Sequence, residues 1–187
     1  MPEITRIETA PHNVSLKSPL TWGQGHKLDC LQHVLVTVTL SDGAKGTAEA
    51  TPRPTIYGET QVSAQHIIAD YLAPILVGKS IESLADIDAL DASLHLVKGN
   101  HTAKGAVNIA LHSALAQSQG ITLGELLGVT AESVPVSYIV GTGSVDAVLV
   151  DVAEGFDAGV RMFKVKIGKS LPQEMQTLRH LINAFPS

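Results

Sequence analysis

The pattern of apolar and polar positions changes twice along the chain. In the first fifty residues, short runs rich in β-branched residues predict strands. The predicted strands are residues 4–9, 33–40 and 46–50. The turn signal Ser41-Asp42-Gly43 joins the last two, which we expect to pair as an antiparallel hairpin. Proline and glycine interrupt residues 16–26 and 51–58, which are predicted loops, and long loops are often functional.

From residue 60 the apolar residues recur every three or four positions, which predicts amphipathic helices. The predicted helices are residues 61–72, 81–97 and 103–119, with a short turn at 123–128. Thr60 and Thr102 are the expected N-caps of the first and third helices, and Pro74 is expected to end the first. We therefore expect an α+β domain over residues 1–133, built from a three-stranded antiparallel meander and a helical bundle.

At residue 134 the pattern becomes an alternation of strand and helix, which is typical of a parallel sheet or a barrel. The expected strands are residues 134–140 and 161–167, and the expected helices are residues 145–158 and 171–184. These elements define a second predicted domain at residues 134–187.

Two lysines on the second of these strands are the strongest functional signal. Lys164 and Lys166 alternate with Phe163, Val165 and Ile167, so both lysines are expected on one face. Two ammonium groups aimed at one place repel each other and are costly to bury, which favours a site that handles an anion or a proton. The alternative is an exposed edge strand whose solvated lysines block aggregation.

Composition narrows the function classes. Hydrophobic residues make up 44% of the 187 residues and charged residues 17%, so we expect a packed core. The net charge of -5, with no basic cluster, disfavours nucleic acid and anionic membranes as partners. Cys30 is the single cysteine, which excludes an internal disulfide. Without a signal-peptide profile or an apolar run of ~20 residues, the chain is predicted to be cytoplasmic.

Several short motifs, spread over the whole chain, are similar to those of one enzyme superfamily. They are Gly46-Thr47-Ala48-Glu49-Ala50, Pro52-Arg53-Pro54-Thr55-Ile56-Tyr57-Gly58-Glu59-Thr60, Thr102-Ala103-Lys104, Leu126-Leu127-Gly128 and Phe163-Lys164-Val165-Lys166-Ile167-Gly168. In this order the chain resembles the enolase superfamily, and most closely the muconate cycloisomerases of its mandelate racemase/muconate lactonizing branch. The resemblance implies an α+β capping domain followed by the first two βα units of a TIM-type barrel.

The resemblance also implies a chemistry. A Mg²⁺ or Mn²⁺ ion holds a substrate carboxylate and stabilises the enolate formed at its α-carbon. By position, Lys166 is the acid/base that moves the proton, and Lys164 is the neighbouring charge that favours a neutral amine on Lys166. The loops at residues 16–26 and 52–57 close over the substrate. The expected substrate-binding residues on them are Trp22, Arg53, Ile56 and Tyr57.

In this family the metal ligands are carboxylates on the third to fifth barrel strands, and the sequence contains none of those strands. A complete barrel needs roughly 250 residues and eight strands. The chain is therefore expected to be a truncated portion that is catalytically inert by itself. The expected partners of the complete protein are a small carboxylate substrate and further copies of itself in a homo-oligomer.

Other functions stay open at this level. Racemisation of an N-acylamino acid, or epimerisation of a dipeptide, uses the same chemistry with a different substrate. A Schiff-base barrel enzyme that uses one lysine is a further alternative. A folded module without catalysis, acting only by association, is the alternative from another class. The eight histidines lack metal-site spacing and are expected at the surface or at helix caps.

Overall fold

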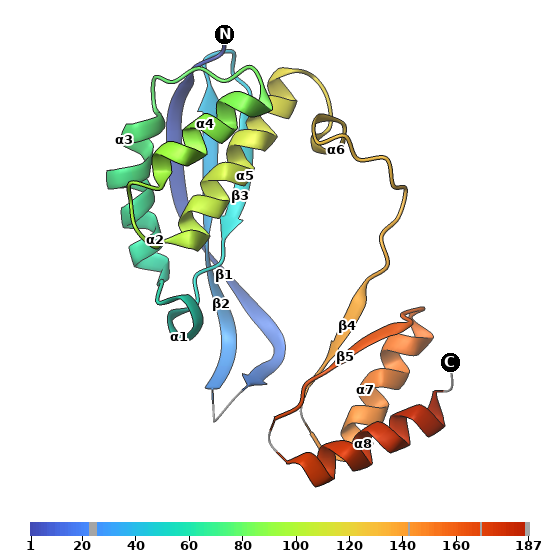
Figure 1. Cartoon of the computed structure of the whole chain (residues 1–187). Helices are drawn as coiled ribbons and strands as arrows, with labels where there is room; N and C mark the ends of the chain where they lie inside the picture. The colour runs from blue at the N-terminus through green and yellow to red at the C-terminus, as the bar shows by residue number, and fades with distance from the viewer. Residues whose placement is uncertain (23–25, 142, 169, 186–187) are drawn as a thin grey trace. The chain divides into compact units, whose positions relative to one another are not determined.

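The computed structural model describes residues 1–22, 26–141, 143–168 and 170–185, with the backbone alone for residues 18, 20–22 and 26 (Figure 1). The chain divides into two compact units. The first comprises Met1–Ser15 and Cys30–Thr130, and the second comprises Leu16–Asp29 and Ala131–Ser187. None of the described helices is long and apolar enough to cross a membrane.

A three-stranded sheet in the order β1-β2-β3 provides one layer of the first unit (Figure 1). Its strands are β1 (Ile4–Trp22), β2 (His26–Leu40) and β3 (Lys45–Ala50). β2 and β3 pair antiparallel, with Val36 opposite Ala48, which confirms the predicted hairpin. Because side chains alternate along a strand, every second residue of β2 faces the core. The buried side chains on this face are Val34, Val36, Val38 and Leu40.

The loop predicted at residues 16–26 is wrong, because strand occupies most of it. β1 runs to Trp22 and β2 begins at His26, while residues 23–25 lie outside the described part of the chain. β1 stands at the end of the strand order, and an edge strand tolerates Pro11 and Pro19 where their missing N–H faces solvent. Proline is therefore a misleading loop signal in this strand.

Helices pack against the sheet and enclose the core of the first unit. They are α1 (Pro54–Tyr57), α2 (Gln61–Ile67), the π-helical turn η1 (Ile68–Leu72), α3 (Ala73–Leu76), α4 (Leu84–Leu94), α5 (His101–Ser118) and α6 (Leu123–Leu126). α5 lies along β3, and the buried side of α5 is rich in alanine (Figure 1). Gly46 of β3 lies directly against the backbone of Ala110 and Ala114, so the helix and the strand approach very closely.

Two of the predicted helix boundaries need correction. The cap at Thr60 is confirmed, since its hydroxyl accepts a hydrogen bond from the Ser63 N–H within a capping box. Pro74, however, does not end the helix. η1 widens the helix just before the proline, which relieves the usual clash with the preceding turn, and α3 continues to Leu76. The helix predicted at 81–97 is shorter, because it starts after a cap at Ser83.

The cap of α4 predicts an acid-sensitive contribution to stability. Asp86 accepts hydrogen bonds from the N–H of Glu82 and from the hydroxyl and N–H of Ser83, and these bonds lower the pKa of Asp86. A carboxyl whose pKa is lower in the folded chain than in the unfolded chain stabilises the fold at pH values above its ordinary pKa of 3.8. This contribution to stability is lost as the pH falls through the pKa of the folded chain.

We therefore expect Asp86→Asn to lower the melting temperature at pH 7 and to flatten its fall between pH 5 and pH 3. Thermal unfolding followed by circular dichroism measures this. Asp88→Asn is the matched control, because Asp88 is exposed on the same helix and makes no hydrogen bond in the described part of the chain. Equal slopes for the two variants would refute the prediction.

The second unit contains two parallel strands packed against two helices (Figure 1). Its elements are β4 (Ser137–Val140), α7 (Val145–Asp157), β5 (Met162–Val165) and α8 (Leu171–Ala184). The predicted alternation and the parallel pairing are confirmed, although both strands are shorter than expected. Val140, Val148 and Val152 form its core, against which Phe163 and Val165 pack. The side chains of β5 that alternate with these two lie on the opposite face of the strand.

Candidate functional site

The two predicted catalytic lysines lie at the carboxyl end of β5. Lys164 is exposed within the strand, where it pairs with Ile139 of β4. Lys166 is half-buried and lies just beyond Val165, the last strand residue. The carboxyl ends of parallel strands are where such folds bind ligands, because the connecting loops converge there. The position of Lys166 therefore fits a functional group, whereas the exposure of Lys164 also fits a solvated lysine.

A cavity of about 210 Å³ lies beside Lys166. It is lined by Gly141, Gly143, Val148, Val165, Lys166, Ile167, Ser170, Gln173, Glu174 and Thr177. The lining brings together an amine, two hydroxyls, an amide and a carboxylate, which suits a small polar ligand. Lys164 is not among the described residues that line it, so the structure brings Lys166 alone of the pair to this cavity.

Glu174 shapes the loop that carries Lys166. Its Oε1 accepts hydrogen bonds from the backbone N–H of Gly168 at 2.8 Å and of Ser170 at 3.1 Å. Gly168 has φ 118, a conformation that glycine adopts without a steric cost. Since Glu174 lies in the first turn of α8, its charge also interacts favourably with the helix dipole. The loop after β5 is thereby fixed to the start of the following helix.

Among the residues that the structure describes, no group of three or more His, Cys, Asp or Glu side chains could hold a metal ion. These side chains do not by themselves fit the Mg²⁺ or Mn²⁺ site that the sequence resemblance implies.

The predicted binding residues of the first unit lie on one segment that follows β3. Arg53 is half-buried and precedes α1, a single turn that occupies half of the loop predicted at residues 51–58. α1 carries Ile56 and Tyr57, which are 58% and 56% exposed. An exposed aliphatic and an exposed aromatic residue therefore follow the half-buried Arg53 within four positions of the chain. For Trp22, the side chain lies outside the described part of the chain.

Glu59 anchors this segment to the start of α5. It is buried, and its carboxylate accepts hydrogen bonds from the N–H of Thr102 at 3.1 Å, from the N–H of Ala103 at 3.3 Å and from the Thr102 hydroxyl. N–H groups in the first turn of a helix have no partner within the helix, and the helix dipole favours a negative charge there. Thr102 is therefore not the N-cap predicted; Asn100 occupies that position, and Glu59 supplies the acceptor.

We expect Glu59→Ala to destabilise the first unit by about 2–4 kcal/mol, because it leaves buried N–H groups without an acceptor. Glu59→Gln retains one acceptor oxygen and should lose less than half as much. Urea unfolding, with hydrogen exchange at Thr102 and Ala103, measures both losses and locates them. A loss in Glu59→Ala without faster exchange at Thr102 and Ala103 would show that the side chain acts by packing and not by capping.

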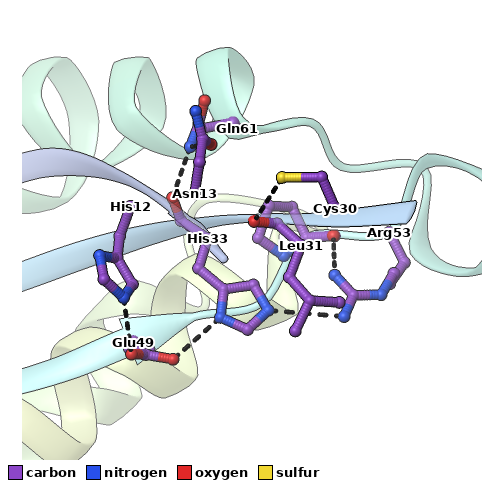
Figure 2. A network of polar contacts seen from close by, with 9 residues as sticks. His12, Asn13, Cys30, Leu31, His33, Glu49, Arg53 and Gln61 are labelled. Atoms are coloured by element: carbon purple, nitrogen blue, oxygen red, sulfur yellow. Dashed lines mark hydrogen bonds and ion pairs between the residues drawn. The ribbon is translucent and has the colours of Figure 1, made fainter. Parts of the chain in front are cut away.

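A polar network beside Arg53 contains a histidine that was expected at the surface or at a cap (Figure 2). His33 of β2 is only 7% exposed. Its Nδ1 lies 2.9 Å from Oε2 of Glu49 on β3, and its Nε2 lies 3.4 Å from Nη2 of Arg53. Both ring nitrogens have partners, so the burial of this polar side chain costs little. Sequence reasoning missed it because these partners are remote along the chain.

The family described as mandelate racemase/muconate lactonizing enzyme, N-terminal domain, matches residues 5–128. The chain belongs to the mandelate racemase/muconate lactonizing enzyme family. The three-stranded sheet and helices of the first unit are the N-terminal capping domain of this enolase-superfamily branch. The matched range contains Arg53, Ile56, Tyr57 and Glu59, while Lys164 and Lys166 lie beyond it.

Individual members of the family show the same similarity. The L-Ala-D/L-Glu epimerase of Bacillus subtilis is 32% identical over 167 residues, which are 89% of this chain and 45% of the epimerase. A muconate lactonizing enzyme from Mycobacterium smegmatis, solved with muconolactone, aligns with a TM-score of 0.91 and 31% identity over 99% of this chain and 50% of its own. A dipeptide epimerase from Cytophaga hutchinsonii, solved with Mg and the dipeptide D-Ala-L-Val, gives a TM-score of 0.84 and 29% identity over 97% of this chain and 49% of its own. The chain thus spans about half the length of the relatives it matches.

Proposed function

We propose that this chain is the N-terminal portion of a cycloisomerase that moves a proton at the α-carbon of a carboxylate substrate through an enolate. The observation that supports this most is the similarity to the muconate lactonizing enzyme solved with muconolactone, at a TM-score of 0.91 over 99% of the chain. The half-buried Lys166, at the carboxyl end of β5 beside a cavity lined by both polar and apolar side chains, provides a group suited to the proton transfer.

In this proposal Lys166 is the acid/base. Muconate closes when an oxygen of one carboxylate adds to the conjugated double bond, and the ammonium form of Lys166 then donates its proton to the α-carbon of the resulting enolate. In the reverse direction the neutral amine takes this α-proton and the ring C–O bond breaks. Lys164 adds positive charge near the developing enolate. Arg53, Ile56 and Tyr57 bind the rest of the substrate. A divalent ion, such as the Mg solved with the Cytophaga epimerase, would supply Lewis-acid stabilisation of the enolate when bound, through residues other than those described here.

Dipeptide epimerisation is the second candidate. It is favoured by the 32% identity to the Bacillus subtilis L-Ala-D/L-Glu epimerase over 89% of the chain. Both reactions include a proton transfer at the carbon next to a carboxylate, so Lys166 would be the proton-transfer group in each. The two differ in the shape of the substrate around that carbon, which Ile56, Tyr57 and residues 16–26 would recognise.

The chain alone should show no turnover with muconolactone and Mg²⁺. Loss of a single element that stabilises an oxyanion costs about 10²–10³ in rate, and here no described group of residues could hold the ion. The measurement is the change in muconolactone absorbance with the purified 187-residue chain. Turnover close to that of a full-length cycloisomerase would contradict this.

Assays of the complete protein with both substrates distinguish the two candidate reactions. We expect it to interconvert muconate and muconolactone, and to be slow with L-Ala-L-Glu. Proton NMR in D₂O follows both, because each reaction incorporates deuterium at the α-carbon. Faster deuterium exchange in the dipeptide than in muconolactone would show that epimerisation, and not cycloisomerisation, is the reaction of the complete protein.

A further inference from the structure

The network in Figure 2 determines which ring nitrogen of His33 carries the proton. The Nε2 atom faces Nη2 of Arg53 at 3.4 Å, and a guanidinium can only donate. The Nδ1 atom faces Oε2 of Glu49 at 2.9 Å, and an ionised carboxylate can only accept. One form of the ring satisfies both contacts: a neutral imidazole with its N–H on Nδ1 and its lone pair on Nε2.

The groups around this contact hold it in place. His12 of β1 places its Nε2 3.8 Å from Oε1 of Glu49, so this carboxylate lies between two histidines. Gln61 of α2 donates to the backbone carbonyl of His33 at 2.6 Å and to Asn13 at 3.0 Å. The backbone that carries the His33 ring is therefore tied both to the helix layer and to β1.

Arg53 keeps most of its donors available. Its Nη2 donates to His33, and its Nη1 donates to the carbonyl of Pro52 at 2.9 Å. Because a guanidinium has five N–H groups, three are left without a partner in the described part of the chain. The side chain is half-buried and precedes the exposed Ile56 and Tyr57. An oriented and partly desolvated guanidinium of this kind suits bidentate binding of a carboxylate.

We propose that His33 is a positioning residue which, as the neutral Nδ1–H tautomer, holds the Arg53 guanidinium so that it binds a second carboxylate of the substrate. Glu49 acts through His33 by fixing the tautomer. This inference rests on the proposed function and applies to its dicarboxylate substrate, muconate, because muconolactone has only one free carboxylate.

NMR of this chain tests the positioning directly. In ¹⁵N-labelled protein at pH 7.5, Nδ1 of His33 should resonate as a protonated nitrogen and Nε2 as an unprotonated one. In His33→Leu, the Arg53 side-chain N–H signals should broaden and exchange faster than in the natural chain. An Nε2–H tautomer, or Arg53 signals that are unchanged in His33→Leu, would overturn the positioning role.

Kinetics of the complete protein test the effect on the substrate. His33→Leu removes both contacts and should raise KM for muconate about five- to tenfold, with kcat within a factor of two. His33→Gln offers one donor and one acceptor and should recover most of the affinity. The matched control is His66→Leu, since His66 also contacts a carboxylate, Asp70, but is exposed. Unchanged KM in His33→Leu, or no recovery in His33→Gln, would overturn the role in substrate binding.

The two measurements separate this inference from the proposed function. If the complete protein turns over neither muconate nor a dipeptide, the proposed function fails, and the NMR result still decides whether His33 holds Arg53. If turnover is normal and His33→Leu leaves KM unchanged, the proposed function stands and the binding role of Arg53 falls.

Discussion

Lys166→Met in the complete protein should reduce exchange of the substrate α-proton with solvent by at least about 10²-fold, while metal and substrate still bind. Methionine keeps most of the apolar stem of lysine and removes the amine, so the loop after β5 should retain its packing. The half-buried position of Lys166 beside the cavity is the structural reason to expect a large effect.

Deuterium exchange measured by proton NMR gives the rate, and calorimetry with Mg²⁺ shows whether the metal site persists. Lys164→Met should leave part of the activity, because Lys164 supplies charge and not the proton. Lys98→Met serves as the control, since Lys98 is an exposed lysine of the first unit. Near-normal exchange in Lys166→Met would leave both lysines as solvated surface groups and remove the acid/base from the proposal.

Local signals in the sequence were sufficient for many elements. The turn at Asp42-Gly43 and the β-branched run before it predict the β2–β3 hairpin, because both strands lie within a few residues of their turn. Thr60 caps α2 through Ser63, only three residues away. The alternating elements after residue 134 follow in the same way. In each case the residues that stabilise the element lie inside it or beside it.

The features that sequence reasoning missed depend on partners that are far apart along the chain. Glu59 caps a helix that begins some forty residues later, and no sequence pattern near Glu59 predicts this contact. His33 is buried because Glu49 and Arg53, from two later segments, satisfy its ring nitrogens. Glu49 and Glu59 both belong to the motifs that carried the family resemblance. The resemblance to the family therefore pointed to Glu49 and Glu59, and the structure shows which contacts each carboxylate makes.

Gly46 belongs to the same set of motifs, and Gly46→Ala should destabilise the first unit by about 3 kcal/mol or more. A Cβ on Gly46 would lie 2.0 Å from the carbonyl oxygen of Ala110 and 2.3 Å from the N of Ala114. Both atoms belong to the backbone of α5, so no side chain can rotate away to make room. The strand and the helix would have to separate, which would expose the alanine-rich face of α5 and loosen the sheet that carries His33 and Glu49.

Gly105→Ala in α5 is the matched control, because it makes the same substitution away from the contact between α5 and β3. Gly105 lies inside α5 and is exposed, and a Cβ there would meet nothing within 4 Å. Alanine has the higher helix propensity, so this variant should be more stable by about 0.5–1 kcal/mol. The change from glycine to alanine should therefore lower the stability of the first unit at Gly46 of β3 and raise it at Gly105 of α5. Hydrogen exchange of the α5 amides, together with urea unfolding, measures both changes. If Gly46→Ala were as stable as the natural chain, α5 and β3 would not be in the close contact that the fold requires, and the anchoring of the Arg53 segment on α5 would need another explanation.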